Sequence, residues 1–195
     1  MTTDNTKRSV LVLGGSQLVL DDTLAGLHEL GYSAQATTDL AGIIGRYDVE
    51  QIDMVVFGGQ VPPQLEAELK QQIGELNPQV IFVQGLGGIP GLIVNLVHGA
   101  FTAEHQDPTH APTYTPREWT IQPTLAEPHD VKVTLWWTTA MVPPDPKSDS
   151  LVLREDRLAA GDHTIPIPDQ IPRKRAFATV QVDEAIYNFS IATEQ

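Results

Sequence analysis

Few residues of this chain have both the type and the spacing that chemistry requires. His105, Asp107 and His110 lie close together, and their imidazole and carboxylate groups are ligands that Zn²⁺ accepts. A structural zinc site needs four ligands on a rigid frame, whereas these residues lie in a polar, proline-rich stretch, so we expect no metal there. Ser16 is not part of the G-x-S-x-G pattern of an activated serine. We therefore predict no catalytic residue.

The most prominent feature is glycine at the ends of three predicted strands. The apolar segments Ser9–Leu13, Ile52–Phe57 and Val80–Gln84 each run directly into glycine. In an open parallel sheet the functional crevice lies at the carboxyl ends of the strands. Bare backbone there lets a ligand or partner approach closely, but it supplies no nucleophile, base or metal ligand. The candidate ligand-binding residues at this edge are Gly14, Gly15, Ser16, Gly58, Gly59, Gly85, Gly87 and Gly88.

A nucleotide site is one hypothesis for this edge, because glycine-rich turns that open helices hold phosphates through backbone N–H groups. Asp39, near the end of the second predicted strand, stands where a ribose-binding acid would be. The first glycine turn, however, lacks the later glycines of the G-x-G-x-x-G fingerprint. The richest glycine loop, from Gly85 to Gly91, follows the last strand of the unit instead of the first. No Walker lysine is present, and we predict no cofactor.

The first half of the chain alternates strands and helices at short spacing. This alternation predicts a parallel sheet with right-handed crossovers and the flavodoxin-like strand order 2-1-3-4. Gly31 is placed to end the first helix, and Asp39 to cap the second. The predicted strands are Ser9–Leu13, Tyr32–Thr37, Ile52–Phe57 and Val80–Gln84, and the helices cover Leu18–Leu30, a short segment after Asp39, Pro63–Leu76 and Gly91–Ala100.

Three segments of this half resemble the response-regulator receiver family: residues 30–32, 53–62 and 78–82. The resemblance covers about half the chain and implies a flavodoxin-like domain. In receivers an acidic pair follows the first strand, a phosphoacceptor aspartate ends the third, and serine or threonine ends the fourth. Here Gly14-Gly15, Gly58 and Gln84 stand at those positions, and no fifth strand carries the family's lysine. The resemblance therefore implies a degenerate receiver-like domain without a Mg²⁺ site or a phosphoacceptor.

Val80–Gln84 is predicted to lie at an edge of this sheet, and an uncovered apolar edge strand is a pairing hazard. We expect the following helix, the second half of the chain or another subunit to cover it. The alternative is that this region packs only within its own chain. The predicted interaction surface consists of Leu92, Ile93, Leu96, Val97 and Trp136.

The sequence of the second half predicts a small antiparallel β-sandwich over residues 118–195. A polar linker, residues 103–117, joins it to an α/β domain over residues 1–102. The pattern of the second half resembles immunoglobulin- or fibronectin-like sandwiches. In Val131–Thr138, alternation buries Trp137 and places Trp136 on the opposite, polar face. The predicted strands are Trp119–Gln122, Val131–Thr138, Leu151–Arg154, His163–Ile167, Ala176–Val182 and Ile186–Ile191.

The amino-acid composition excludes some classes of binding partner and of chemistry. The net charge of −13 argues against nucleic acid and anionic membranes, since both require a basic surface. The absence of cysteine excludes disulfides and thiolate chemistry, and no apolar run reaches the ~20 residues of a spanning helix, so we expect a cytoplasmic protein. The leading hypothesis is a non-catalytic regulatory or assembly module that forms a homo-oligomer or binds a protein partner. The alternative is a nucleotide- or other small-ligand-binding protein or enzyme that uses the glycine edge.

Overall fold

The computed structural model describes residues 7–143 and 145–192. The chain divides into two compact units. The first unit comprises Met1–Val97 and Val142–Pro146, and the second comprises His98–Met141 and Lys147–Gln195. Residues 98–117, which include the predicted linker, belong to the second unit in this division.

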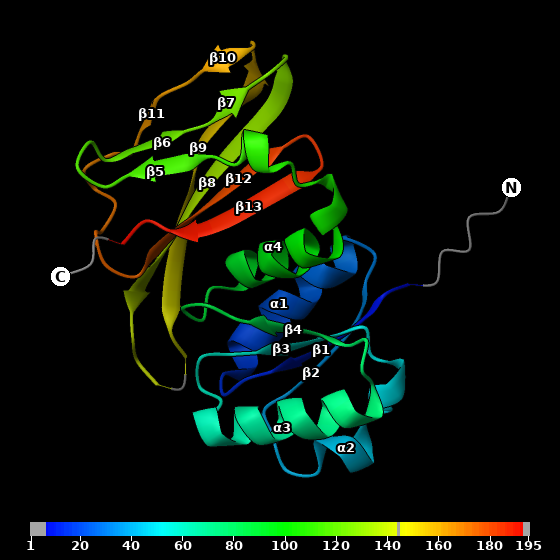
Figure 1. Ribbon diagram of the computed structural model, residues 1–195. Helices are drawn as coiled ribbons and strands as arrows, with labels where there is room; N and C mark the ends of the chain where they lie inside the picture. Colours follow the sequence, from blue (N-terminus) through cyan, green and yellow to red (C-terminus); the bar gives the residue numbers. More distant parts are fainter. Residues whose placement is uncertain (1–6, 144, 193–195) are drawn as a thin grey trace, which may run out of the picture. The chain divides into compact units, whose positions relative to one another are not determined.

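The first unit is built on a parallel four-stranded sheet with the order β2-β1-β3-β4, which confirms the predicted topology (Figure 1). Helix α1 lies on one face of the sheet, and α2 and α3 lie on the other (Figure 1). The strands are β1 (Ser9–Leu13), β2 (Ser33–Thr37), β3 (Met54–Phe57) and β4 (Ile81–Gln84). The helices are α1 (Gln17–Glu29), α2 (Ile43–Arg46), α3 (Pro63–Leu76) and α4 (Pro90–Phe101), with a 3₁₀ turn η1 (Val49–Gln51).

The central strands consist almost entirely of apolar residues, as expected where both faces of a sheet are covered. All four residues of β3 are buried, as are four of the five in β1. On the α2/α3 face, Phe57 and Leu11 pack in one cluster with Ile43 and Ile73. Two central strands and helices on both faces therefore form the core of this unit.

The ends of the first helix follow from local residue chemistry. Ser16 is the N-cap of α1, and its Oγ accepts a hydrogen bond from the Val19 N–H (3.2 Å). Gly31 has φ = +87°, and the N–H groups of Gly31 and Tyr32 donate to the carbonyls of His28 (2.9 Å) and Leu27 (3.1 Å). This Schellman pair confirms Gly31 as the helix stop.

The expected cap of the second helix is wrong. Asp39 Oδ1 accepts from the Ala41 N–H (3.1 Å), which forms a local turn before the helix. The N-cap of α2 is Gly42, whose φ of +66° suits a glycine. The carboxylate of Asp39 pairs instead with Arg46 (2.7 Å) near the end of the same helix.

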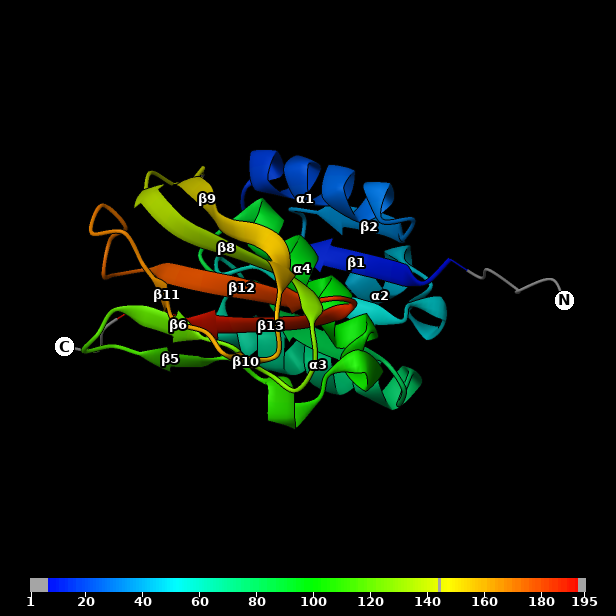
Figure 2. The ribbon, with the colours of Figure 1, turned by 90° about the horizontal axis from the view of Figure 1, so that it is seen from above.

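The second unit is antiparallel β structure. Its largest sheet has the order β13-β12-β8-β9, which Figure 2 shows from above. That sheet consists of β8 (His129–Ala140), β9 (Lys147–Leu158), β12 (Ala176–Val182) and β13 (Ala185–Ser190). A smaller sheet contains β5 (Thr113–Thr115), β6 (Thr120–Gln122) and β11 (Ile165–Pro166), and β7 (Thr124–Leu125) pairs with β10 (Gly161–Asp162). The predicted linker contains β5 and two 3₁₀ turns, η2 (Ala103–His105) and η3 (Pro108–His110).

Alternation along β8 places Val131, Val133 and Leu135 in the core, as predicted. Val133 and Leu135 are fully buried and lie opposite Val180 and Ala178 of β12. Trp137 packs against the same cluster, which also contains Ile121 and other residues of the small sheet. The two sheets therefore share one core.

The edge strand β9 carries a bulge. Its pairing with β8 passes from Val133↔Arg154 to Thr134↔Val152, so Leu153 has no directly opposed partner. Bulges and charged side chains are two of the ways in which proteins protect sheet edges from unwanted pairing. Among the helices described, none is long and apolar enough to cross a membrane.

Candidate functional site

The structure brings the glycines at the strand ends together and gives several of them a structural role. The Gly58 N–H donates to the Leu13 carbonyl (2.7 Å), and the Gly85 N–H donates to the Phe57 carbonyl (2.7 Å). A Cβ at Gly58 would lie 3.0 Å from the Leu13 oxygen, and one at Gly85 would lie 3.2 Å from the Phe57 oxygen. The sheet ladder thus continues past the strands, and the close approach of neighbouring backbones requires glycine.

Side chains of the first unit occupy the space next to this edge. A Cβ at Gly15 would collide with the side chain of Gln60. Ser16 is only 4% exposed, and its Oγ donates to Asp145 Oδ1 (2.6 Å) while it caps α1. Pro146 lies against Gly88. Gly87 and Gly88 both adopt the left-handed backbone conformation, with φ of +64° and +62°. At Gly59, no atom lies within 4 Å of the position that a Cβ would take.

The predicted interaction surface is only partly accessible. Leu92, Ile93 and Val97 are 0–2% exposed, so these three side chains of α4 are core residues. Leu96 is half-buried. Trp136 is half-buried as well, and its indole N–H donates to Thr179 Oγ1 (2.9 Å). Of the five residues predicted to form an interaction surface, only Leu96 and Trp136 therefore remain partly accessible to a partner.

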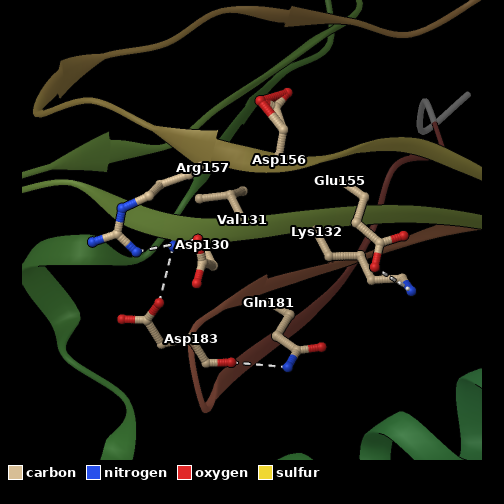
Figure 3. Close-up of a pocket in the computed structure, with 8 residues that line it drawn as sticks. All are labelled: Asp130, Val131, Lys132, Glu155, Asp156, Arg157, Gln181 and Asp183. Carbon is tan, nitrogen blue, oxygen red and sulfur yellow. Dashed lines mark hydrogen bonds and ion pairs between the residues drawn. The ribbon is translucent and has the colours of Figure 1, made fainter.

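A groove of about 400 Å³ lies in the second unit, over the end of the large sheet (Figure 3). None of the residues lining it was singled out from the sequence as a site residue. They come from β8, β9, β12 and the turn between β12 and β13, and we call this site the carboxylate groove. Its lining residues are Asp130, Val131, Lys132, Glu155, Asp156, Arg157, Gln181 and Asp183.

Charge in the carboxylate groove is only partly balanced. Lys132 Nζ pairs with Glu155 Oε1 (3.1 Å), and Arg157 Nη1 pairs with Asp130 Oδ1 (3.2 Å), as Figure 3 shows. The lining contains four carboxylates and two cations. The Asp156 carboxylate is 51% exposed and contacts Arg154 (2.8 Å), which lies outside the lining. The groove is therefore an open, acidic surface.

Both carboxylate oxygens of Asp183 have a partner. Asp183 occupies the two-residue turn after β12 with φ = +50°, a conformation that costs most residues energy but that aspartate tolerates. Its Oδ1 accepts from the Asp130 N–H (2.9 Å), and its Oδ2 lies 2.7 Å from His129 Nδ1. The hydrogen bond from His129 is the main cause that holds the pKa of Asp183 below its usual value, against the effect of burial. The carboxylate is therefore ionised at neutral pH.

A second pocket, of about 420 Å³, shares Asp183 with the groove, and we call it the histidine pocket. The rings of His110 and His129 lie 5.3 Å apart at an angle of 58°. His129 Nε2 is buried and has no hydrogen-bond partner. The lining consists of His105, His110, His129, Val182, Asp183, Glu184, Ala185 and Tyr187.

The three linker residues considered for zinc do not form a ligand set. His105 Nε2 faces Glu184 (3.5 Å), and Asp107 Oδ1 caps η3 through the N–H and hydroxyl of Thr109 (2.8 and 2.7 Å). These bonds from Thr109 lower the pKa of Asp107. Across residues 7–143 and 145–192, no group of three or more His, Asp or Glu side chains is arranged to hold a metal ion.

Comparison with known proteins adds little to this geometry. Neither a protein-family model nor a curated protein sequence matches the chain. Among solved structures, the solution NMR structure of a de novo designed Rossmann 2x3 fold protein aligns with 51% of this chain and 92% of its own. The identity in that alignment is 16% and the TM-score is 0.32. Because this score is low, the fold assignment rests on the strand order and register described above.

Proposed function

We propose that the protein is a non-catalytic interaction module, in which the carboxylate groove binds a basic, extended segment of a partner protein. The first unit would be a receiver-like domain without phosphotransfer residues, since Gly58 follows β3 where a receiver carries its phosphoacceptor. The second unit would be a sandwich of the immunoglobulin-like type, used for binding. Both assignments belong to this proposal.

The observation that carries the proposal is the distribution of charge around the groove. Asp130, Glu155 and Asp183 come from β8, β9 and the β12–β13 turn and lie on one side of β9, whereas Asp156 lines the groove from the other side of that strand (Figure 3). Their side chains are 48–71% exposed, so a ligand can reach them without prior unfolding. Lysine or arginine side chains of a partner would find carboxylates whose negative charge exceeds the local positive charge.

The carboxylate groove borders the edge strand β9, along which an extended peptide could lie. Glu155, Asp156 and Arg157 lie on β9, which pairs only with β8 among the described strands. An extended peptide alongside β9 could use its free backbone groups while basic side chains reach the groove. The acidic residues of β9 oppose pairing with an acidic strand, and this favours a basic partner.

Small-ligand binding at the glycine edge has weaker support. The side chain of Gln60 lies over Gly15, and the carboxylate of Asp145 is bonded to the hydroxyl at the start of α1. A phosphate placed at that helix start would meet a negative charge where it needs N–H donors. The glycines that end β3 and β4 are also explained by backbone packing alone.

The test is a fluorescence-anisotropy titration with a labelled peptide of alternating lysine and threonine, and with the glutamate-for-lysine peptide as its control. The double variant Glu155→Gln/Asp156→Asn should weaken binding about threefold to tenfold, as expected from the loss of two exposed ion pairs. The double variant Asp21→Asn/Asp22→Asn removes the same charge from exposed positions of α1 and should bind like the wild type. Equal losses in both variants would mean general attraction to an acidic protein and would contradict a defined groove.

The same samples test self-assembly. Light scattering during size-exclusion chromatography measures the molar mass at each concentration. A homo-oligomer that is insensitive to the groove variant and to salt would favour assembly through another surface. A protein that is monomeric alone but binds the basic peptide would support the proposed function.

A further inference from the structure

The histidine pocket contains a ligand position that the protein itself does not fill. His129 lies at the start of β8, and its side chain is 14% exposed, with Nε2 fully shielded and unpartnered. A buried ring nitrogen without a partner is uncommon, because the loss of its hydration is not compensated. We propose that the histidine pocket binds a divalent transition-metal ion, with His129 Nε2 as the first ligand and His110 as the second.

The tautomer of His129 suits a metal ligand. His129 Nδ1 lies 2.7 Å from Oδ2 of Asp183, and a carboxylate oxygen accepts a hydrogen bond, so Nδ1 carries the proton of this contact. In the neutral ring the lone pair is then on Nε2, the buried nitrogen that has no hydrogen-bond partner. A carboxylate that orients an imidazole in this way is the usual outer partner of metal-binding histidines.

His110 is the second imidazole within reach. Its ring centre lies 5.3 Å from that of His129, and its side chain is 19% exposed. Its Nδ1 lies 4.0 Å from the Asp107 carboxylate, beyond hydrogen-bond distance, so the ring can rotate without breaking a strong bond. Two rings at this separation can approach one ion through small side-chain rotations.

The remaining coordination positions would be taken by water and by the exposed side chain of Glu184. Glu184 is 79% exposed, and its contact with His105 is long (3.5 Å). Because no set of three ligands is already assembled among the described residues, the site should bind more weakly than a structural zinc site.

The donor set decides which ions fit. Imidazole nitrogens favour Zn²⁺, Ni²⁺ and Cu²⁺, whereas Mg²⁺ and Ca²⁺ prefer sites made only of oxygen. The carboxylates of Asp183 and Glu184 add negative charge to the lining, which favours a divalent cation over an anion. This inference does not require the proposed peptide binding, although both pockets include Asp183.

The test is isothermal titration of the full chain with Zn²⁺, repeated with Ni²⁺ and with Mg²⁺. The wild type should bind one equivalent of Zn²⁺ or Ni²⁺ and no Mg²⁺. His129→Gln should abolish this site, and Asp183→Asn should weaken it about 10- to 100-fold, as expected for removal of an orienting carboxylate. His163→Gln is the matched control: His163 lies in the same unit but outside the pocket, with Nε2 2.8 Å from the Ala159 carbonyl. It should leave the affinity unchanged.

A second measurement on the unmodified protein covers the case in which a variant fails to fold. Addition of Zn²⁺ should shift the Nε2 resonance of His129 in a ¹⁵N spectrum of the histidine rings, with the Nδ1 proton retained. A wild type that binds no Zn²⁺, a His129 Nε2 resonance that does not move, or a folded His129→Gln variant with unchanged affinity would each overturn the proposal.

Discussion

His129 Nδ1 and Asp183 Oδ2 lie 2.7 Å apart although 54 residues separate them in the sequence. This contact joins the start of β8 to the turn between β12 and β13. It orders the one residue that the carboxylate groove and the histidine pocket share, Asp183. The two proposed sites are therefore coupled through a single carboxylate, and a change at Asp183 should affect both.

The first prediction concerns the pH dependence of stability. The pKa of Asp183 is lowered in the folded protein, so folding favours its ionised form, and this contribution is present above the pKa of the unfolded chain. It is lost as the pH falls through the folded-state value. Because the side chain is 48% exposed, the contribution should be only about 1 kcal/mol.

Thermal unfolding of the wild type and of Asp183→Asn, followed from pH 7 to pH 3, checks this. The wild type should be more stable at pH 7, and the difference should shrink at the acid end. A difference that stays constant over the whole range would show that Asp183 acts by packing or turn geometry instead of charge.

The second prediction concerns the glycines that follow the strands. Gly58→Ala should destabilise the first unit by about 1–3 kcal/mol, because the new Cβ would lie 3.0 Å from the Leu13 carbonyl in a rigid sheet. Gly59→Ala is the matched control, since nothing lies within 4 Å of its Cβ position. Urea unfolding of both variants measures the difference. Equal stability of the two would contradict the backbone-packing explanation.

The third prediction concerns α4. Leu92 is fully buried, so Leu92→Asp should cost more than about 3 kcal/mol or prevent folding, because it places a carboxylate in the core. Leu18→Asp should change the stability by less than about 0.5 kcal/mol, since Leu18 is 57% exposed in the first turn of α1. Circular dichroism during heating compares the two variants. A well-folded Leu92→Asp protein with altered oligomeric state would restore Leu92 to the interaction surface.

The fourth prediction concerns the core of the second unit. Leu135→Ala should lower the free energy of unfolding by about 2–5 kcal/mol, because the side chain is fully buried between the sheets. Val152→Ala, on the neighbouring strand and 48% exposed, should cost less than about 1 kcal/mol. Tryptophan fluorescence during denaturation follows this unit. Comparable losses in both variants would place the core elsewhere.

Local signals in the sequence were sufficient for much of the fold. Continuous apolar runs that end in glycine identified β1, β3 and β4, and Gly31 identified the end of α1. Alternation separated Trp137 from Trp136 across β8. Each of these features depends on neighbours within a few residues, which a pattern can reveal.

The candidate sites depend on long-range contacts and could not be found in this way. Nothing in the sequence pairs His129 with Asp183, and His110 was considered only with its near neighbours His105 and Asp107. The glycine edge was visible, but its meaning depends on how closely one strand end approaches the next, as at Gly58. Burial of Leu92 likewise depends on tertiary packing that an apolar helix pattern does not specify.

The bulge in β9 has a consequence for the periodicity of that strand. Leu151 lies opposite Leu135 and Leu158 lies opposite His129, so an odd-numbered and an even-numbered residue of β9 share one face of the sheet. The alternation of side chains between the two faces therefore changes phase at Leu153. For this reason the sequence pattern revealed only Leu151–Arg154 of this twelve-residue strand. Deleting Leu153 would remove the extra residue and leave the other residues of β9 opposite their present partners in β8, so both halves should keep their faces while the pairing becomes regular.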